Sequence, residues 1–145
     1  MNQIRTSERG YTLMEVLAVL ALIAALLTLV GPNVINSMNS GQVKATKSQI
    51  KALDNVLKQY YMDNYTYPTT EQGLKALIEK PTIPPIPENW NGPYLSEKAL
   101  PKDAWGEEIK YISPGVHNPD KYDIFSLGRD KKEGGEGIEA DIGNW

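Results

Sequence analysis

Five carboxylate side chains lie within twelve residues near the C-terminal end of the sequence: Asp130, Glu133, Glu136, Glu139 and Asp141. Four glycines in the same segment, at positions 128, 134, 135 and 137, allow the backbone to curl. Calcium takes about six to eight oxygen ligands from carboxylates and backbone carbonyls. The spacing is not that of an EF-hand, because Lys132 and Gly134 stand where that loop requires oxygen side chains. From the residues alone, the segment is either a calcium site or a solvated acidic loop.

A second unusual carboxylate is Glu15, which lies inside the apolar run 11–31 and is the only charged residue between Arg9 and Lys44. Placing a carboxylate at membrane depth costs about 2.5–3.5 kcal/mol on insertion scales, so such a group normally has a partner. Two interpretations remain open. Glu15 lies near the cytoplasmic interface among lipid headgroups, or its partner is an amino terminus or a group on another molecule.

Several kinds of chemistry are excluded by composition. The sequence has no cysteine and a single histidine, His117, so disulfides, thiol nucleophiles and paired-histidine metal sites are impossible. The motifs G-x-S-x-G, H-E-x-x-H and the phosphate-binding G-x-x-x-x-G-K-[ST] are missing. The net charge of −3 argues against a nucleic-acid partner. His117 falls in a predicted turn and is expected to be a surface residue. No enzymatic function is predicted.

The apolar run 11–31 is long enough for a bilayer-spanning helix, which needs about 20 residues. It is also longer than the apolar part of a removable signal peptide, about 7–15 residues. Arg5 and Arg9 precede the run, and no basic residue follows it closely. This asymmetry predicts that the N-terminus lies in the cytoplasm and the rest of the chain outside.

Beyond the run, Gly31-Pro32 predicts a kink or a melted stretch, or alternatively a full stop of the helix, and Gly41 is a second weak point. A new helical pattern starts at Lys44, with apolar residues spaced by three and four: Ile50, Leu53, Val56, Leu57, Tyr60 and Tyr61. This stripe is expected to cover a core rather than to contact another subunit, and Tyr67-Pro68 to end the helix. An unbroken helix from Tyr11 to Tyr65 would span about 80 Å.

The rest of the chain predicts a small α+β domain. Thr69 and Gln72 fit a capping box that opens a second helix ending before Pro81. The proline-rich range 81–101 is expected to be an irregular loop, anchored to the core by Trp90 and Tyr94. Strands are predicted at 108–112 and 122–126, with a brief third strand at 141–143.

The N-terminal motif Gly10-Tyr11-Thr12-Leu13-Met14-Glu15, followed by an aliphatic run, resembles the class III signal of type IV pilins and pseudopilins. The resemblance implies that prepilin peptidase cuts between Gly10 and Tyr11 and that the new N-terminal residue, Tyr11, is methylated. The family usually has Phe at the position of Tyr11. Glu15 becomes the fifth mature residue, and by family resemblance it pairs with the Tyr11 amine of a neighbouring subunit during assembly.

The C-terminal segment resembles the major pseudopilins of type II secretion systems, through Tyr-Asp-Ile-Phe-Ser-Leu-Gly at 122–128, Asp130, and Ala-Asp-Ile-Gly-Asn-Trp at 140–145. Stretches at 67–74, 90–95 and 101–106 are similar to the same family. The resemblance implies a type IV pilin-like fold, in which a long, half-transmembrane N-terminal helix packs on a small antiparallel sheet. It also implies a structural calcium ion in the C-terminal loop. Carried over, Asp130 is the firmest side-chain ligand. The candidates for the other ligands are the side chains of Glu136, Glu139 and Asp141 and the backbone carbonyls of Leu127 and Lys132.

Together these features divide the chain into a leader at 1–10, a transmembrane and assembly helix at 11–31, and a periplasmic domain at 32–145. By resemblance, the subunit leaves the bacterial inner membrane and forms a homo-oligomeric helical filament, the periplasmic pseudopilus, which drives type II secretion across the outer membrane. The implied partners are minor pseudopilins, the inner-membrane assembly platform and prepilin peptidase.

Three alternatives remain. The nearest is a type IV pilin subunit of a surface pilus, although many such pilins carry a C-terminal disulfide that a chain without cysteine cannot form. The others are an anchored periplasmic calcium-binding domain that does not polymerise and a secreted hydrolase.

Overall fold

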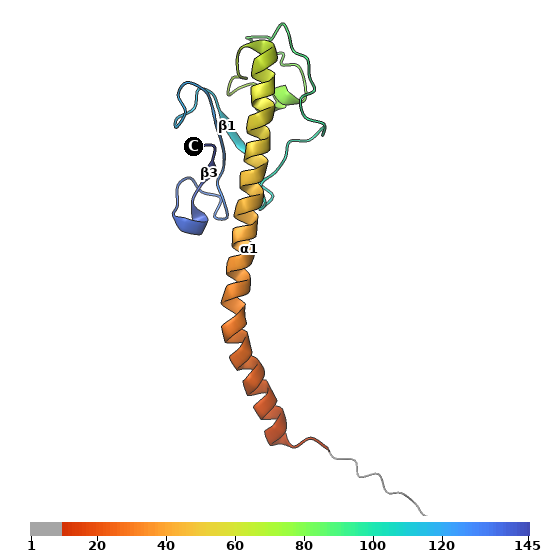
Figure 1. Cartoon of the computed structure of the whole chain (residues 1–145), viewed down its shortest axis with the longest axis vertical. Coiled ribbons are helices and arrows are strands. Elements are labelled where there is room, and N and C mark those ends of the chain that lie inside the picture. The colour runs from red at the N-terminus through yellow and green to blue at the C-terminus, as the bar shows by residue number, and fades with distance from the viewer. Residues whose placement is uncertain (1–9) are drawn as a thin grey trace, which may run out of the picture. The chain divides into compact units, whose positions relative to one another are not determined.

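The computed structural model describes residues 10–145. Its elements in chain order are α1 (Leu13–Asn64), the 3₁₀ helix η1 (Leu74–Leu77), β1 (Lys110–Ile112), β2 (Asp123–Ser126), the 3₁₀ helix η2 (Gly137–Glu139) and β3 (Ile142–Gly143) (Figure 1). The chain divides into two compact units, one ending at Met38 and the other comprising Asn39–Trp145. The α+β prediction, a long N-terminal helix with a small antiparallel sheet, is confirmed.

The first unit contains the N-terminal part of α1. An 18-residue window of this helix has a mean hydropathy of 2.7 and is not buried by any other part of the described chain, so the helix is long and apolar enough to cross a membrane. The helix continues through Gly31-Pro32. The expected melted stretch or helix stop is therefore not found. Proline removes only one backbone donor, so the other hydrogen bonds of the helix can still form on both sides of it.

The second unit is built on the C-terminal part of α1. Ile50, Leu53, Leu57 and Tyr60 are buried, which confirms that the apolar stripe covers a core. They pack in one cluster with residues of η1 and of the sheet. Tyr61, at the edge of the stripe, remains 42% exposed and stacks on Tyr67 at a centroid distance of 4.7 Å.

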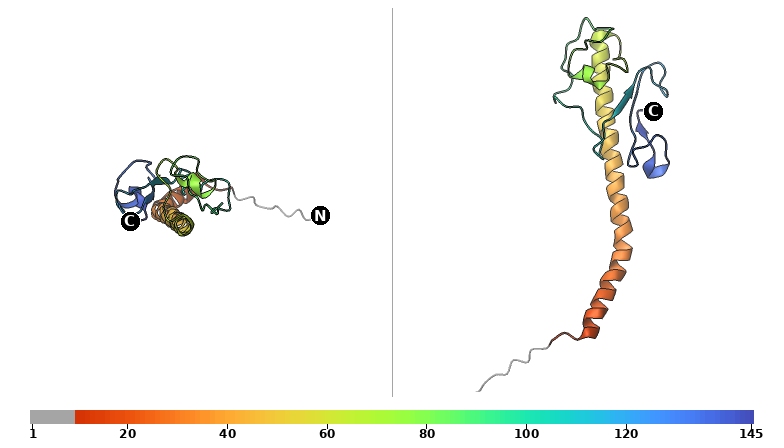
Figure 2. Two further views of the ribbon diagram at one scale, coloured as in Figure 1. Left: turned by 90° about the horizontal axis from the view of Figure 1, so that it is seen from above. Right: turned by 180° about the vertical axis from the view of Figure 1, so that it is seen from behind.

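The sheet has the order β1-β2-β3 and is antiparallel throughout, with Tyr111 opposite Ile124 and Ser126 opposite Ile142. All three predicted strands are present, although each is shorter than expected. Figure 2 shows that the sheet and the C-terminal loop lie on one side of this part of α1, whereas η1 and the proline-rich segment lie on the other. A hydrogen bond of 2.7 Å from the Tyr122 hydroxyl to Asp54 Oδ1 ties the start of β2 to the helix.

The segment after α1 differs from the sequence prediction. The capping box is confirmed: the Thr69 amide donates to Gln72 Oε1 at 3.0 Å, and the Gln72 amide donates to Thr69 Oγ1 at 3.2 Å. The α-helix predicted after it is wrong, because only a turn and the four residues of η1 form there. Gly73 adopts φ +58°, which takes the backbone out of the right-handed helical path.

The range 81–101 contains no helix or strand, as predicted. Trp90 and Tyr94 anchor it. The Trp90 indole N–H donates to the Ala76 carbonyl at 2.9 Å, and the Tyr94 hydroxyl donates to Asp63 Oδ2 at 2.9 Å. The loop is therefore fixed to η1 at one side chain and to α1 at the other.

Candidate functional site

The predicted processing site lies at the start of the described chain. Gly10 and Tyr11 precede α1 and are exposed, with Tyr11 88% accessible. Glu15 forms a local cap: its Oε2 accepts the Thr12 amide at 2.9 Å, and the Glu15 amide donates to Thr12 Oγ1 at 3.2 Å. A Thr followed three residues later by a Glu is the sequence pattern of a capping box, so the spacing of Thr12 and Glu15 is the sequence signal for this cap.

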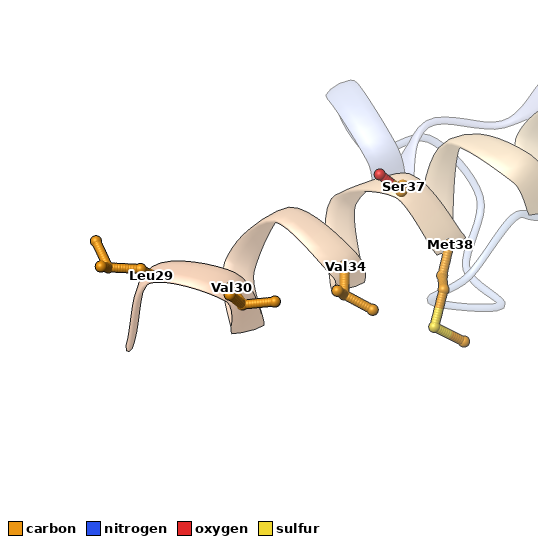
Figure 3. Close-up of a pocket in the computed structure, with 5 residues that line it drawn as sticks. All are labelled: Leu29, Val30, Val34, Ser37 and Met38. Carbon is orange, nitrogen blue, oxygen red and sulfur yellow. The ribbon is translucent and has the colours of Figure 1, made fainter. Parts of the chain in front are cut away.

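The large apolar side chains of the first unit are exposed within the described chain. Large side chains around the whole circumference are accessible, among them Leu13, Leu17, Leu20, Ile23, Leu27 and Val30. Farther along, Val30, Val34 and Met38 project from one side of the helix and border a shallow hollow with Leu29 and Ser37 (Figure 3). An apolar area of this extent requires lipid or another protein surface to cover it.

The acidic C-terminal loop is closed by Gly134 and Asp141. The Gly134 amide donates to Asp141 Oδ2 at 2.9 Å, and the Asp141 amide donates to the Gly134 carbonyl at 3.1 Å. Near the start of the loop, Asp130 Oδ1 accepts the Lys132 amide at 3.1 Å. Lys131, between them, adopts φ +60°, a conformation that favours glycine.

The predicted calcium ligands are not gathered into one cluster of side chains. Within residues 10–145, no three carboxylate or histidine side chains lie close enough together to hold a metal ion. Glu136 and Glu139 are exposed, Asp130 and Leu127 are half-buried, and Lys132 is exposed. Asp141 differs from these residues, because its Oδ1 is buried and has no hydrogen-bond partner in the described part of the chain. This orphaned anionic oxygen fits a cation ligand, and the carbonyls of the curled backbone supply the other donor type that calcium uses.

A buried carboxylate that sequence reasoning did not single out is Asp123, which is 1% exposed. Its Oδ2 accepts the Val116 and His117 amides at 2.7 Å each, and its Oδ1 accepts the Asn118 amide at 3.0 Å. Burial raises the pKa of Asp123, but the hydrogen bonds from His117 and Asn118 outweigh it and hold the pKa below its ordinary value. Asp123 thus organises the turn between β1 and β2.

His117 is half exposed, as expected of a surface residue, and stacks on the indole of Trp145 at a centroid distance of 3.8 Å. Its Nδ1 lies 3.3 Å from Asp123 Oδ2. Asn144 holds the same region, since its Oδ1 accepts the Ile124 amide at 3.0 Å. The C-terminal residues are therefore fixed to β2 and to the turn before it. In the sequence, Tyr-Asp at 122–123 was predicted only as the start of a strand and as part of a resemblance, and Asn-Trp at 144–145 only as part of that resemblance.

A family model described as Type II secretion system (T2SS), protein G, matches residues 33–145. The chain belongs to this family. A second model, the prokaryotic N-terminal methylation motif, matches residues 5–31. The protein G family match favours the pseudopilin prediction over the type IV pilin alternative.

Relatives in the family match along almost their whole length. The type II secretion system core protein G of Pseudomonas aeruginosa is 44% identical over 142 residues, which cover 97% of each chain. That of Vibrio cholerae is 45% identical over 139 residues, covering 95% of this chain and 92% of the relative. The crystal structure of the major pseudopilin from enterohaemorrhagic Escherichia coli is 40% identical, with a TM-score of 0.66 over 79% of this chain and 95% of the other.

Proposed function

We propose that this chain is the subunit of a periplasmic pseudopilus that drives protein secretion through a type II system. The observation that carries the proposal is the combination of a protein G domain with an apolar helix that nothing in the described chain covers. In the membrane, lipid covers this helix. In a homo-oligomeric helical filament, the helices of neighbouring copies replace the lipid. The role is structural, and no catalytic step is assigned to the chain.

The proposed route begins at the inner membrane, with the N-terminus in the cytoplasm and the domain in the periplasm. Prepilin peptidase cuts between Gly10 and Tyr11, and Tyr11 is methylated. The exposure of both residues, outside α1, supports access by a peptidase, as does the match of residues 5–31 to the methylation motif. The further partners are the inner-membrane assembly platform and the minor pseudopilins.

Glu15 is proposed to pair with the Tyr11 amine of an adjacent subunit during assembly. Among residues 10–145 its carboxylate is bound only to the amide and hydroxyl of Thr12, at 2.9 and 3.2 Å. These two neutral donors leave its negative charge uncompensated. A charge inside an apolar assembly is retained when an opposite charge lies against it, and the freed amine supplies one.

Calcium is proposed to bind the C-terminal loop, with Asp141 as the central ligand. The support is the buried, unpartnered Oδ1 of Asp141 and the repulsion among five neighbouring carboxylates, which a divalent cation would relieve. Asp130 and the carbonyls of Leu127 and Lys132 are the next candidates. Glu136 and Glu139 join only if the loop rearranges, since no three carboxylates of the described chain lie close enough together to hold a metal ion.

The function is tested by deleting the gene in its own host and following the proteins that the host normally secretes. Loss of the subunit should trap these proteins in the periplasm, and restoring the intact gene should return them to the medium. A matched strain that restores a version with Gly10→Pro, which blocks cleavage, should remain defective. Normal secretion in the deletion strain would contradict the proposed function.

A further inference from the structure

Asp103 is a buried carboxylate, 5% exposed, that none of the proposed steps uses. Its Oδ1 accepts the amides of Trp105 and Glu107 at 2.9 and 2.8 Å, which shapes the turn 103–107. Its Oδ2 accepts the hydroxyl of Ser126 at 2.5 Å. Ser126 is the last residue of β2 and is 0% exposed. Asp103, 23 residues before Ser126, therefore holds the end of β2, where the acidic loop begins.

Ser126 also contacts the acidic loop directly. Its Oγ accepts the amide of Gly128 at 3.0 Å. Gly128 has φ +69°, and a Cβ placed on it would lie 3.1 Å from the Ala140 carbonyl. The two ends of the acidic loop thus pass each other at Gly128. The hydrogen bond from this amide fixes the backbone between Leu127 and Asp130, two of the residues proposed to bind calcium.

Two further contacts fix the turn 103–107 to α1 and to the acidic loop. The Ala104 amide donates to Thr46 Oγ1 at 3.1 Å, and Thr46 is 0% exposed in α1. On the outside, Lys131 Nζ lies 2.5 Å from Glu107 Oε1. The turn therefore joins α1 to both the start of the loop and its first charged stretch. Since Asp103 and Ser126 are both buried, neither group can exchange its partner for water.

We infer that Asp103 and Ser126 are positioning residues that hold the start of the acidic loop, so that the backbone between Leu127 and Asp130, two of the proposed cation ligands, stays in place. They touch no ligand themselves. Removing the Ser126 hydroxyl leaves Asp103 Oδ2 and the Gly128 amide without their partner, and the loop start is released. The cation is the calcium of the proposed function, but the positioning of the loop does not depend on its presence.

The test uses the full chain in detergent micelles, with Ser126→Ala, the conservative Ser126→Thr, and Thr70→Ala as a matched control. Thr70 also bridges two segments through its hydroxyl, which accepts the Ser113 amide at 2.9 Å, but it lies outside the loop. Amide hydrogen exchange is measured in EGTA. Ser126→Ala should speed exchange in 127–141 by about tenfold while the peptide around Tyr60 is unchanged. Ser126→Thr and Thr70→Ala should leave 127–141 protected.

Calcium titration calorimetry on the same variants completes the test. Ser126→Ala should weaken calcium binding by about tenfold, and Thr70→Ala should not change it. Unchanged exchange in 127–141, or an equal increase around Tyr60, would overturn the inference, because the pair would then have no specific effect on the loop. If the wild-type chain binds no calcium, the calcium proposal fails, and the exchange measurement still decides whether the pair positions the loop.

Discussion

Glu15 Oε2 accepts a hydrogen bond of 2.9 Å from the backbone amide of Thr12, three residues earlier. The same carboxylate is the proposed partner of the Tyr11 amine in a neighbouring subunit. Two roles therefore meet in one side chain, a helix cap and a charge for assembly. They can be separated because glutamine also serves in a capping box but carries no charge.

The first prediction follows from this separation. Glu15→Gln should keep the start of α1 helical but prevent assembly, since the charge is lost. Thr12→Ala should remove about 1 kcal/mol of capping free energy and leave assembly intact, since the charge is kept. Assembly is measured as the amount of subunit in sheared filament fractions. If Glu15→Gln assembles normally and Thr12→Ala does not, the carboxylate acts as a cap and the pairing proposal is wrong.

The calcium proposal predicts a stability change on metal removal. Binding to the folded state stabilises it by mass action, about 2.7 kcal/mol when free calcium is 100 times the Kd. The Tm of the domain should therefore be higher in calcium than in EGTA. In Asp141→Asn the two values should coincide, whereas Glu88→Gln, which removes an exposed carboxylate elsewhere, should respond like wild type. Equal Tm values for the wild-type chain in calcium and in EGTA would reject a structural calcium.

Lys131 provides a third test, because it occupies a left-handed backbone position, φ +60°, which favours glycine. Lys131→Gly relieves a backbone cost of about 1 kcal/mol. It also removes the exposed ion pair with Glu107, which contributes about 0–1 kcal/mol. The free energy of unfolding in EGTA should thus change by less than about 1 kcal/mol. Calcium should bind about twofold more tightly, because a positive charge leaves the loop. Weaker calcium binding would show that Lys131 supports the loop.

Asp123 predicts a defined dependence of stability on pH. Its pKa is depressed in the folded state, so the stability that its ionised form contributes is present above the ordinary value of about 3.9 and is lost as pH falls through the folded pKa. Asp123→Asn should lower the free energy of unfolding by about 2–3 kcal/mol at pH 7, and the difference should shrink below pH ~3.

The control for this prediction is Asp120→Asn, which removes an exposed carboxylate from the same turn and should have little effect at either pH. Thermal unfolding followed by near-UV circular dichroism measures both variants. A difference between Asp123→Asn and wild type that stays constant from pH 7 to pH 2 would contradict the account, since ionisation of Asp123 would then be irrelevant.

Much of the fold follows from local patterns. The stripe at Ile50, Leu53, Leu57 and Tyr60 predicts a buried helix face because side chains spaced by three and four share one side. The β-prone runs at 108–112 and 122–126 likewise predicted strands. The helix expected after Gln72 did not form, because it depended on the conformation of Gly73, which glycine leaves open.

The functional residues were harder to predict from the sequence, because the residues that contact one another are far apart in it. Asp103 finds Ser126 across 23 positions, and no spacing rule predicts such a pair. In the sequence Asp123 is one of many acidic residues. Only the folded turn shows that its oxygens accept the backbone amides of residues 116–118. The candidate calcium ligands were recognised through family resemblance. From the residues alone, a calcium site could not be distinguished from a solvated acidic loop.

The central claim is that this chain polymerises through its apolar helix into a type II secretion pseudopilus. The most direct measurement is electron microscopy of filaments sheared from cells that overproduce the chain together with a type II secretion machinery lacking its own protein G, with mass spectrometry of the subunit. The account predicts filaments whose subunit begins at Tyr11, and none from Glu15→Gln. A processed subunit that remains dispersed in the membrane fraction, with no filaments from the wild-type chain, would contradict it.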